Sequence, residues 1–110
     1  MAKLDCNLKG RLFSILKDID DAVMQSISAT LEEESTFTCG NATCVVRVYE
    51  RYSYTGQNRV SMNITAVACD DNVHLCAMTS GGSQALFFKF NTFGEESFLD
   101  TIVSAVEKYK

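Results

Sequence analysis

A strict alternation of apolar and polar residues in the middle of the chain limits its fold more than any other feature. Between residues 60 and 68 every second side chain is apolar: Val60, Met62, Ile64, Ala66 and Ala68. Successive side chains of a β-strand point to opposite sides, so this period of two places all five on one face. The alternation therefore predicts a strand with one buried face and one polar face.

Other alternating segments lie on both sides of this strand. They cover residues 2–8, 27–37, 44–54, 73–77 and 83–90. Between the later segments stand residue types that favour tight turns, at Gly40-Asn41, Gly56, Asp71-Asn72 and Gly81-Gly82. Short turns join neighbouring strands as antiparallel hairpins, so the sequence predicts an antiparallel meander.

Two segments have the spacing of amphipathic helices. In the first, at about residues 11–25, the apolar stripe consists of Leu12, Ile15, Leu16, Ile19, Val23 and Ile27. The second is expected after Gly94 and runs to the end of the chain. Glu95 and Glu96 lie in its first turn and Lys108 and Lys110 at its end, which matches the helix dipole.

The predicted order is β-α-β-β-β-β-β-α, an α+β fold in a single domain over residues 1–110. The helices are expected on one face of the sheet, and the other face meets solvent or a partner. This order resembles a reduced helix-grip architecture, as in START-like lipid-binding domains, where a curved sheet grips a C-terminal helix. The likeness concerns architecture and implies no function.

Composition argues against several classes of protein. The formal charge is -4, whereas a general nucleic-acid binder is usually basic. No apolar run approaches the ~20 residues of a membrane span, and the first residues do not resemble a signal peptide. Five cysteines without an export signal suggest free thiols, so we expect a cytoplasmic protein. A single histidine and no CxxC motif suggest no metal and no cofactor.

Strand parity predicts a site on the core side of the sheet. If a four-residue loop, residues 40–43, joins the second and third strands, Glu33 faces Glu50 on the side that also carries Val46 and Val48. We expect a pocket lined by Glu33, Glu50, Tyr52, Tyr54 and Met62. The alternative is that the end of the sheet bends out of the core, or contains a bulge, and leaves both acids in solvent.

The same register places Cys39 opposite Cys44, either as a redox-sensitive pair or as two small core residues. The outward face then carries Arg47, Tyr49 and Arg51. With the outward Phe87, these residues are candidates for an interface, because Tyr and Arg are favoured there. Alternatively, the arginines are held by surface ion pairs, such as Arg51 with Glu32 on the neighbouring strand.

Three stretches carry a family resemblance. The segments "RVYERYSYTGQNRVSMNIT" and "AMTSGGSQALFFKFNTFGEESFLD", with the opening "MAKL", are similar to a small bacterial family of unknown function, the DUF6054-type proteins. The resemblance covers nearly the whole chain. It implies a free-standing domain and brings no activity or catalytic residue with it.

Two functions remain open at this stage. The first is a non-enzymatic module that binds a small apolar ligand between the curved sheet and the C-terminal helix. The second is a homo-oligomeric interaction module, such as a dimer, in which outward Tyr49 and Phe87 are covered by another copy. An enzyme that uses Glu33 and Glu50 as acid and base ranks third. Neither nucleic acid nor a membrane is expected as a partner.

Overall fold

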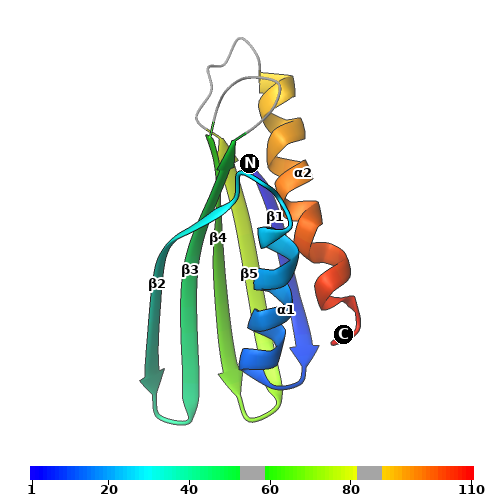
Figure 1. Ribbon diagram of the computed structural model, residues 1–110. Helices are drawn as coiled ribbons and strands as arrows, with labels where there is room; N and C mark the ends of the chain where they lie inside the picture. Colours follow the sequence, from blue (N-terminus) through cyan, green and yellow to red (C-terminus); the bar gives the residue numbers. More distant parts are fainter. Residues whose placement is uncertain (53–58, 82–87) are drawn as a thin grey trace.

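The computed structural model describes residues 1–52, 59–81 and 88–110, with side chains from residue 97 onward in the last range (Figure 1). The chain forms an α+β fold. Its elements are β1 (Ala2–Lys9), α1 (Leu12–Met24), β2 (Thr30–Cys39), β3 (Ala42–Tyr52), β4 (Arg59–Cys69), β5 (Asn72–Gly81) and α2 (Phe88–Glu107). Neither helix is long and apolar enough, over the described residues, to cross a membrane.

The five described strands form one antiparallel sheet in the order β1-β5-β4-β3-β2. Both helices lie on the same side of this sheet (Figure 1). Of the further strand expected at residues 83–90, residues 83–87 lie outside the described part, and Phe88–Phe90 belong to α2. The sequence predicted a helix that starts after Gly94, whereas α2 begins at Phe88. A short apolar run cannot be assigned to strand or helix by its periodicity alone.

The core lies between the sheet and the two helices. The alternation in β4 is confirmed, since its even-numbered residues from Val60 to Ala68 are all buried. The apolar stripe of α1 is confirmed through Val23, but Ile27 lies beyond the end of the helix and is 97% exposed. From the other elements, the buried side chains include Leu8, Val45, Tyr49, Val73, Leu75, Ala77, Phe98, Ile102 and Val106.

The predicted facing of β3 is wrong. Val45 and Tyr49 are buried against the helices, whereas Val46 and Val48 lie on the opposite face of the sheet and are only partly buried. The register explains this, because Tyr49 pairs with the inward Met62 of β4. Apolar residues occupy both parities of β3, so its own pattern could not indicate which face is covered.

The turn between β2 and β3 contains two residues, Gly40 and Asn41, and not the expected four. Gly40 has a φ of 61°, which suits a glycine at the first central position of such a turn. Cys39 therefore pairs with Ala42. A register shift between Leu31 and Glu33 marks a bulge in β2, in agreement with the alternative that the sequence left open.

Two glycines with positive φ offer a matched test of packing at the chain's end. Gly10 has a φ of 147°, and a Cβ on it would lie 3.0 Å from Cδ1 of Tyr109. A Cβ on Gly40 would meet nothing within 4 Å. Both Gly→Ala changes introduce backbone strain of about 1–3 kcal/mol. Gly10→Ala should lose about 1–3 kcal/mol more from the clash with the ring.

Urea denaturation of both variants measures this difference. Equal losses of unfolding free energy would contradict the tight packing of Tyr109 on the turn between β1 and α1.

Candidate interaction surface on the open face of the sheet

Of the five residues predicted to line a ligand pocket, the four that the structure describes do not come together. Met62 is fully buried on the helix side, whereas Glu33, Glu50 and Tyr52 lie on the opposite side of the sheet. Tyr54 lies outside the described residues.

The two acids also do not face each other. Glu33 pairs with Val48, and Glu50 pairs with Thr30. Glu50 instead forms an ion pair with Arg59, with 2.6 Å between Oε1 and Nη2. The guanidinium of Arg59 also lies 5.5 Å from the centre of the Tyr52 ring. The predicted opposition of two carboxylates is therefore wrong, because the turn is shorter than assumed and β2 contains a bulge.

The predicted cysteine pair is separated by the same change of register. Cys39 pairs with Ala42 and Cys44 pairs with Phe37, so the two thiols lie on different rungs of the β2–β3 ladder. All five cysteines are free thiols. The described residues contain no group of three or more His, Cys, Asp or Glu side chains placed to hold a metal ion.

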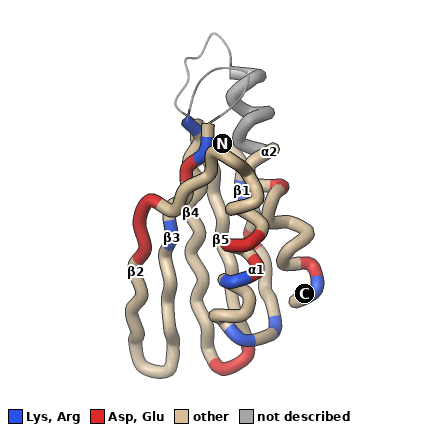
Figure 2. Tube along the Cα trace, viewed as in Figure 1, with Lys and Arg blue, Asp and Glu red and all other residues tan. Residues whose placement is uncertain are grey.

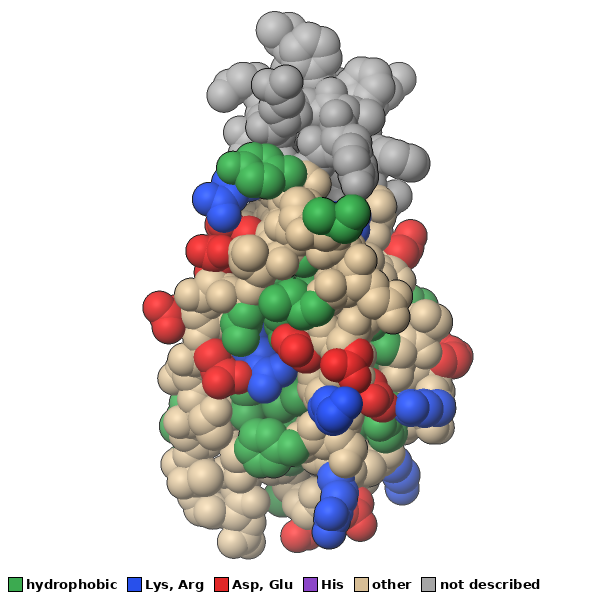
Figure 3. Space-filling view, viewed as in Figure 1, with side chains coloured by type: hydrophobic (Ala, Val, Ile, Leu, Met, Phe, Trp, Pro, Cys, Tyr) green, Lys and Arg blue, Asp and Glu red, His purple; other side chains and the backbone are tan. Residues whose placement is uncertain are grey.

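The residues expected at an outward interface connect the sheet to the helices instead. The Tyr49 hydroxyl donates a hydrogen bond of 2.7 Å to Asp20 on α1. Arg47 donates to the carbonyl oxygen of Leu16 and to the Tyr49 hydroxyl, each at 3.4 Å, and forms an ion pair with Glu34. Figure 3 shows acidic and basic side chains side by side between α1 and the β2–β3 hairpin.

Arg51 also points to the helix side and not outward. It donates hydrogen bonds to the hydroxyl groups of Ser26 and Ser97, and its guanidinium lies 4.7 Å from the centre of the Phe98 ring. The expected Arg51–Glu32 pair is replaced by a contact of Glu32 with Arg59 at 3.7 Å. Phe87, the remaining interface candidate, lies outside the described residues.

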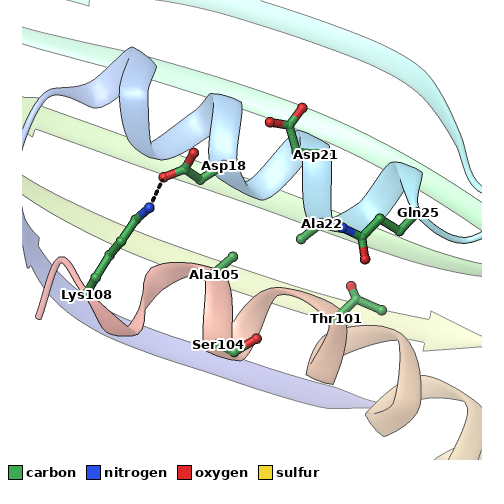
Figure 4. A pocket seen from close by; sticks show the side chains of 8 residues that line it. All are labelled: Asp18, Asp21, Ala22, Gln25, Thr101, Ser104, Ala105 and Lys108. Carbon is green, nitrogen blue, oxygen red and sulfur yellow. Dashed lines mark ion pairs between the residues drawn. The ribbon is translucent and has the colours of Figure 1, made fainter.

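A groove separates the two helices (Figure 4). It has a volume of about 330 Å³, and its lining is mostly polar or small: Asp18, Asp21, Ala22, Gln25, Thr101, Ser104, Ala105 and Lys108. Asp18 is bound by Lys108 at 3.0 Å and by the Tyr109 hydroxyl. These hydrogen bonds, that of Tyr109 first, lower the pKa of the Asp18 carboxyl. The contacts of Asp18 with Lys108 and Tyr109 thus link α1 to α2 across the groove. Asp21, the other acid in the lining, forms an ion pair with Lys17.

The side of the sheet opposite α1 and α2 is here called the open face. Its central part carries no charge. This neutral patch consists of Ser35, Phe37, Cys39, Ala42, Cys44, Val46, Val48, Ser61, Asn63, Thr65, Val67, Cys69, Cys76 and Met78. Phe37 is 53% exposed, Met78 44% and Val67 38%. Solvent-facing sides of antiparallel sheets are normally polar, so this composition makes the open face the candidate interaction surface.

Charged residues border the neutral patch on both edge strands. One lateral row crosses all five strands as Glu33, Val48, Asn63, Met78 and Lys3. The row begins with an acid on β2 and ends with a base on β1. Figure 2 shows the acidic residues of β2 gathered in the half that is far from the β2–β3 turn.

A polar cluster occupies the β1–β5 margin of the open face. His74 on β5 contacts Asp5, with 2.6 Å between Nε2 and Oδ1, and its Nδ1 lies 2.9 Å from the side-chain oxygen of Asn7. The open face can be recognised in the sequence of β4. Every outward position of β4 from Ser61 to Cys69 is uncharged.

The whole chain, residues 1–110, matches the model described as a family of unknown function, DUF6054. No curated protein and no solved structure matches it.

The Tyr49–Asp20 contact predicts both a loss of stability and a shifted titration. Burial, and then the hydrogen bond to Asp20, raise the pKa of Tyr49 to about 12. Tyr49→Phe should lower the unfolding free energy by about 1–2 kcal/mol, because Asp20 and Arg47 lose a hydrogen-bond partner. The matched change Tyr52→Phe, at an exposed ring, should stay within about 0.5 kcal/mol.

The pH dependence follows from the same shift. The unfolded state ionises at a tyrosine's ordinary pKa of about 10, so the contribution of Tyr49 is complete below that pH and is lost as the pH rises toward 12. Denaturation measured from pH 9 to 11.5 should show a steeper fall for the unchanged protein than for Tyr49→Phe. Parallel curves would exclude a buried, hydrogen-bonded hydroxyl.

Proposed function

Because the chain belongs to the DUF6054 family, whose function is unknown, we propose a role from its own surfaces: it is a homo-oligomeric interaction module. In this proposal the open face of the sheet binds the open face of a second copy. The observation that carries the proposal is the neutral patch, an uncharged and largely apolar area on a sheet face that neither helix of the described chain covers.

The open face is large enough for a specific dimer. Strands ~4.8 Å apart with a rise of ~3.3 Å per residue give a face of roughly 600 Å² for five strands with eight residues in the shortest. Two such faces together bury roughly 1,200 Å², at the lower end of standard interfaces. The partly buried valines of β3 would lie in its centre.

Charge complementarity favours a second copy of this chain as the occupant. A two-fold axis parallel to β4, between two stacked sheets, places β1 of one copy over β2 of the other. The row from Glu33 to Lys3 then lies over the same row of the other copy, in the opposite order. Lys3 lies opposite Glu33 of the other copy, and Val48 lies opposite Met78. Outward residues of β4 lie on the axis, so Val67 lies opposite Val67 of the other copy.

A small apolar ligand between the sheet and α2 is the competing hypothesis. Self-association is favoured over it because Met62, Phe98 and Ile102 fill the space between sheet and helix in the described region, each at 0% exposure. We also propose a cytoplasmic location, which suits five free thiols. The packing of α2 on β1, β4 and β5 supports the helix-grip likeness as architecture.

Reversing the charges of the Lys3–Glu33 pair tests the proposed two-fold arrangement. Either Lys3→Glu or Glu33→Lys alone should weaken the dimer by about tenfold, because a like-charged contact would occur twice in each dimer. The double variant should restore dimerisation. Sedimentation equilibrium at low salt measures the dissociation constants.

Two further variants serve as a negative and a positive control. Lys9→Glu changes a charge on the same face of β1, in the row that ends at Cys39, and should have little effect. Val67→Lys places two charges on the axis and should give monomers. A double variant as weak as its parents would contradict the arrangement.

A further inference from the structure

Strand β2 is an unusual edge of the sheet. It has ten residues and every one of them is exposed, so neither face of the strand is covered along its length. It lies at one end of the strand order, and within the described part of the chain no strand pairs with its outer side. An exposed edge presents unpaired N–H and C=O groups to which another strand can bind.

The two halves of β2 differ in how they are protected against pairing. The first half contains Glu32, Glu33 and Glu34 and a bulge, both of which discourage uncontrolled pairing. The second half, residues 35–39, has the sequence STFTC, with no charge and no proline. Its β-branched and aromatic residues favour extended pairing. Residues 35–39 can therefore pair with an added strand, whereas the glutamates of the first half restrict which strands can pair.

The turn geometry shows which backbone groups face outward. A two-residue turn closes on a hydrogen-bonded pair, here Cys39 and Ala42, and such pairs alternate along the ladder. Phe37 and Ser35 therefore direct their backbone groups to β3. Thr38, Thr36 and Glu34 direct theirs to the free edge, where an added strand would bind. The Glu34 N–H there donates a hydrogen bond of 3.3 Å to the Glu33 carboxylate, which an added strand would replace.

The side of α1 that faces β3 carries exposed apolar residues. Leu16 and Asp20 face β3, since they accept hydrogen bonds from Arg47 and Tyr49. Phe13 and Met24 lie one helical turn from these two residues, and so on the same side of α1. They are 62% and 44% exposed.

The charges select the type of segment. Four acids, Glu32, Glu33, Glu34 and Glu50, gather at one end of β2, and the bases that pair with them are Arg47 and Arg59. The four acids therefore outnumber the two arginines that form ion pairs with them. Basic residues of a partner would complete the pairing there.

A second copy is a poor occupant for this edge. Antiparallel pairing of two β2 edges requires a two-fold axis perpendicular to the sheet at β2, whereas the proposed dimer has its axis along β4. These axes do not intersect, so both contacts together would produce an open-ended array instead of a closed assembly. This step alone depends on the proposed function.

We infer that β2 binds an extended segment of a different protein, which adds to the sheet as an antiparallel strand. The segment has β-branched or apolar residues beside Ser35–Cys39 and basic residues at its C-terminal end, beside Glu32–Glu34. Backbone hydrogen bonds to Glu34, Thr36 and Thr38 hold it, and side-chain contacts select it.

The test uses a fluorescein-labelled eight-residue peptide, in which Thr and Val alternate over five positions and Lys-Val-Lys follows. Fluorescence anisotropy should show saturable binding to the full chain. Thr36→Pro removes an N–H that faces only the free edge, and should weaken binding by about tenfold or more. Thr36→Val keeps that N–H and is the matched control. A peptide with Glu in place of both Lys should bind more weakly.

Hydrogen exchange identifies the contact. The peptide should slow exchange at the amides of Glu34, Thr36 and Thr38 and leave Phe37 unchanged. Undetectable binding, or equal binding by Thr36→Pro and Thr36→Val, would overturn the inference. A lower oligomeric mass for Thr36→Pro without peptide would also overturn it, since a second copy would then occupy the edge.

The inference and the proposed dimer can fail separately. Val67→Lys should bind the peptide as a monomer, and Thr36→Pro should remain a dimer.

Discussion

The packing of one face of the sheet against two helices is the constraint on which the rest of the structure depends. The even-numbered residues of β4 and the odd-numbered residues of β5 from Val73 to Thr79 are buried beneath α1 and α2. Tyr49 extends this core to β3 through its contact with Asp20. Two helices cannot also cover the other side of a five-stranded sheet, and they do not reach across β2. The open face and the free edge are both direct consequences.

These two surfaces differ in what they can bind. The open face is broad, uncharged at its centre and bordered by an acid on one edge and a base on the other. A surface of that kind is complementary to itself under a two-fold rotation. The edge of β2 offers backbone groups and an excess of acids, which suits an extended basic segment. A dimer with two such edges would present two equivalent binding sites.

The sequence was sufficient to predict the α+β class, the first helix, the antiparallel strands and the core face of β4. Each depends on a local period that one segment carries by itself, as in Val60 to Ala68. The facing of β3 could not be predicted, because Val45, Val46, Val48 and Tyr49 occupy both parities and only pairing with β4 decides between them. Among the described residues, the candidates derived from that facing changed sides with it, as Glu50 and Arg51 did. The Glu33–Glu50 and Cys39–Cys44 pairs failed for a different reason. The length of the β2–β3 turn introduced a second error, since two extra loop residues shift every cross-strand partner.

Sedimentation equilibrium of the unmodified protein under reducing conditions tests the central claim most directly. The account predicts a reversible dimer with twice the chain mass of 12.2 kDa across the micromolar range. A mass of one chain at several hundred micromolar would contradict it, because a self-complementary face of roughly 600 Å² per copy should then be occupied.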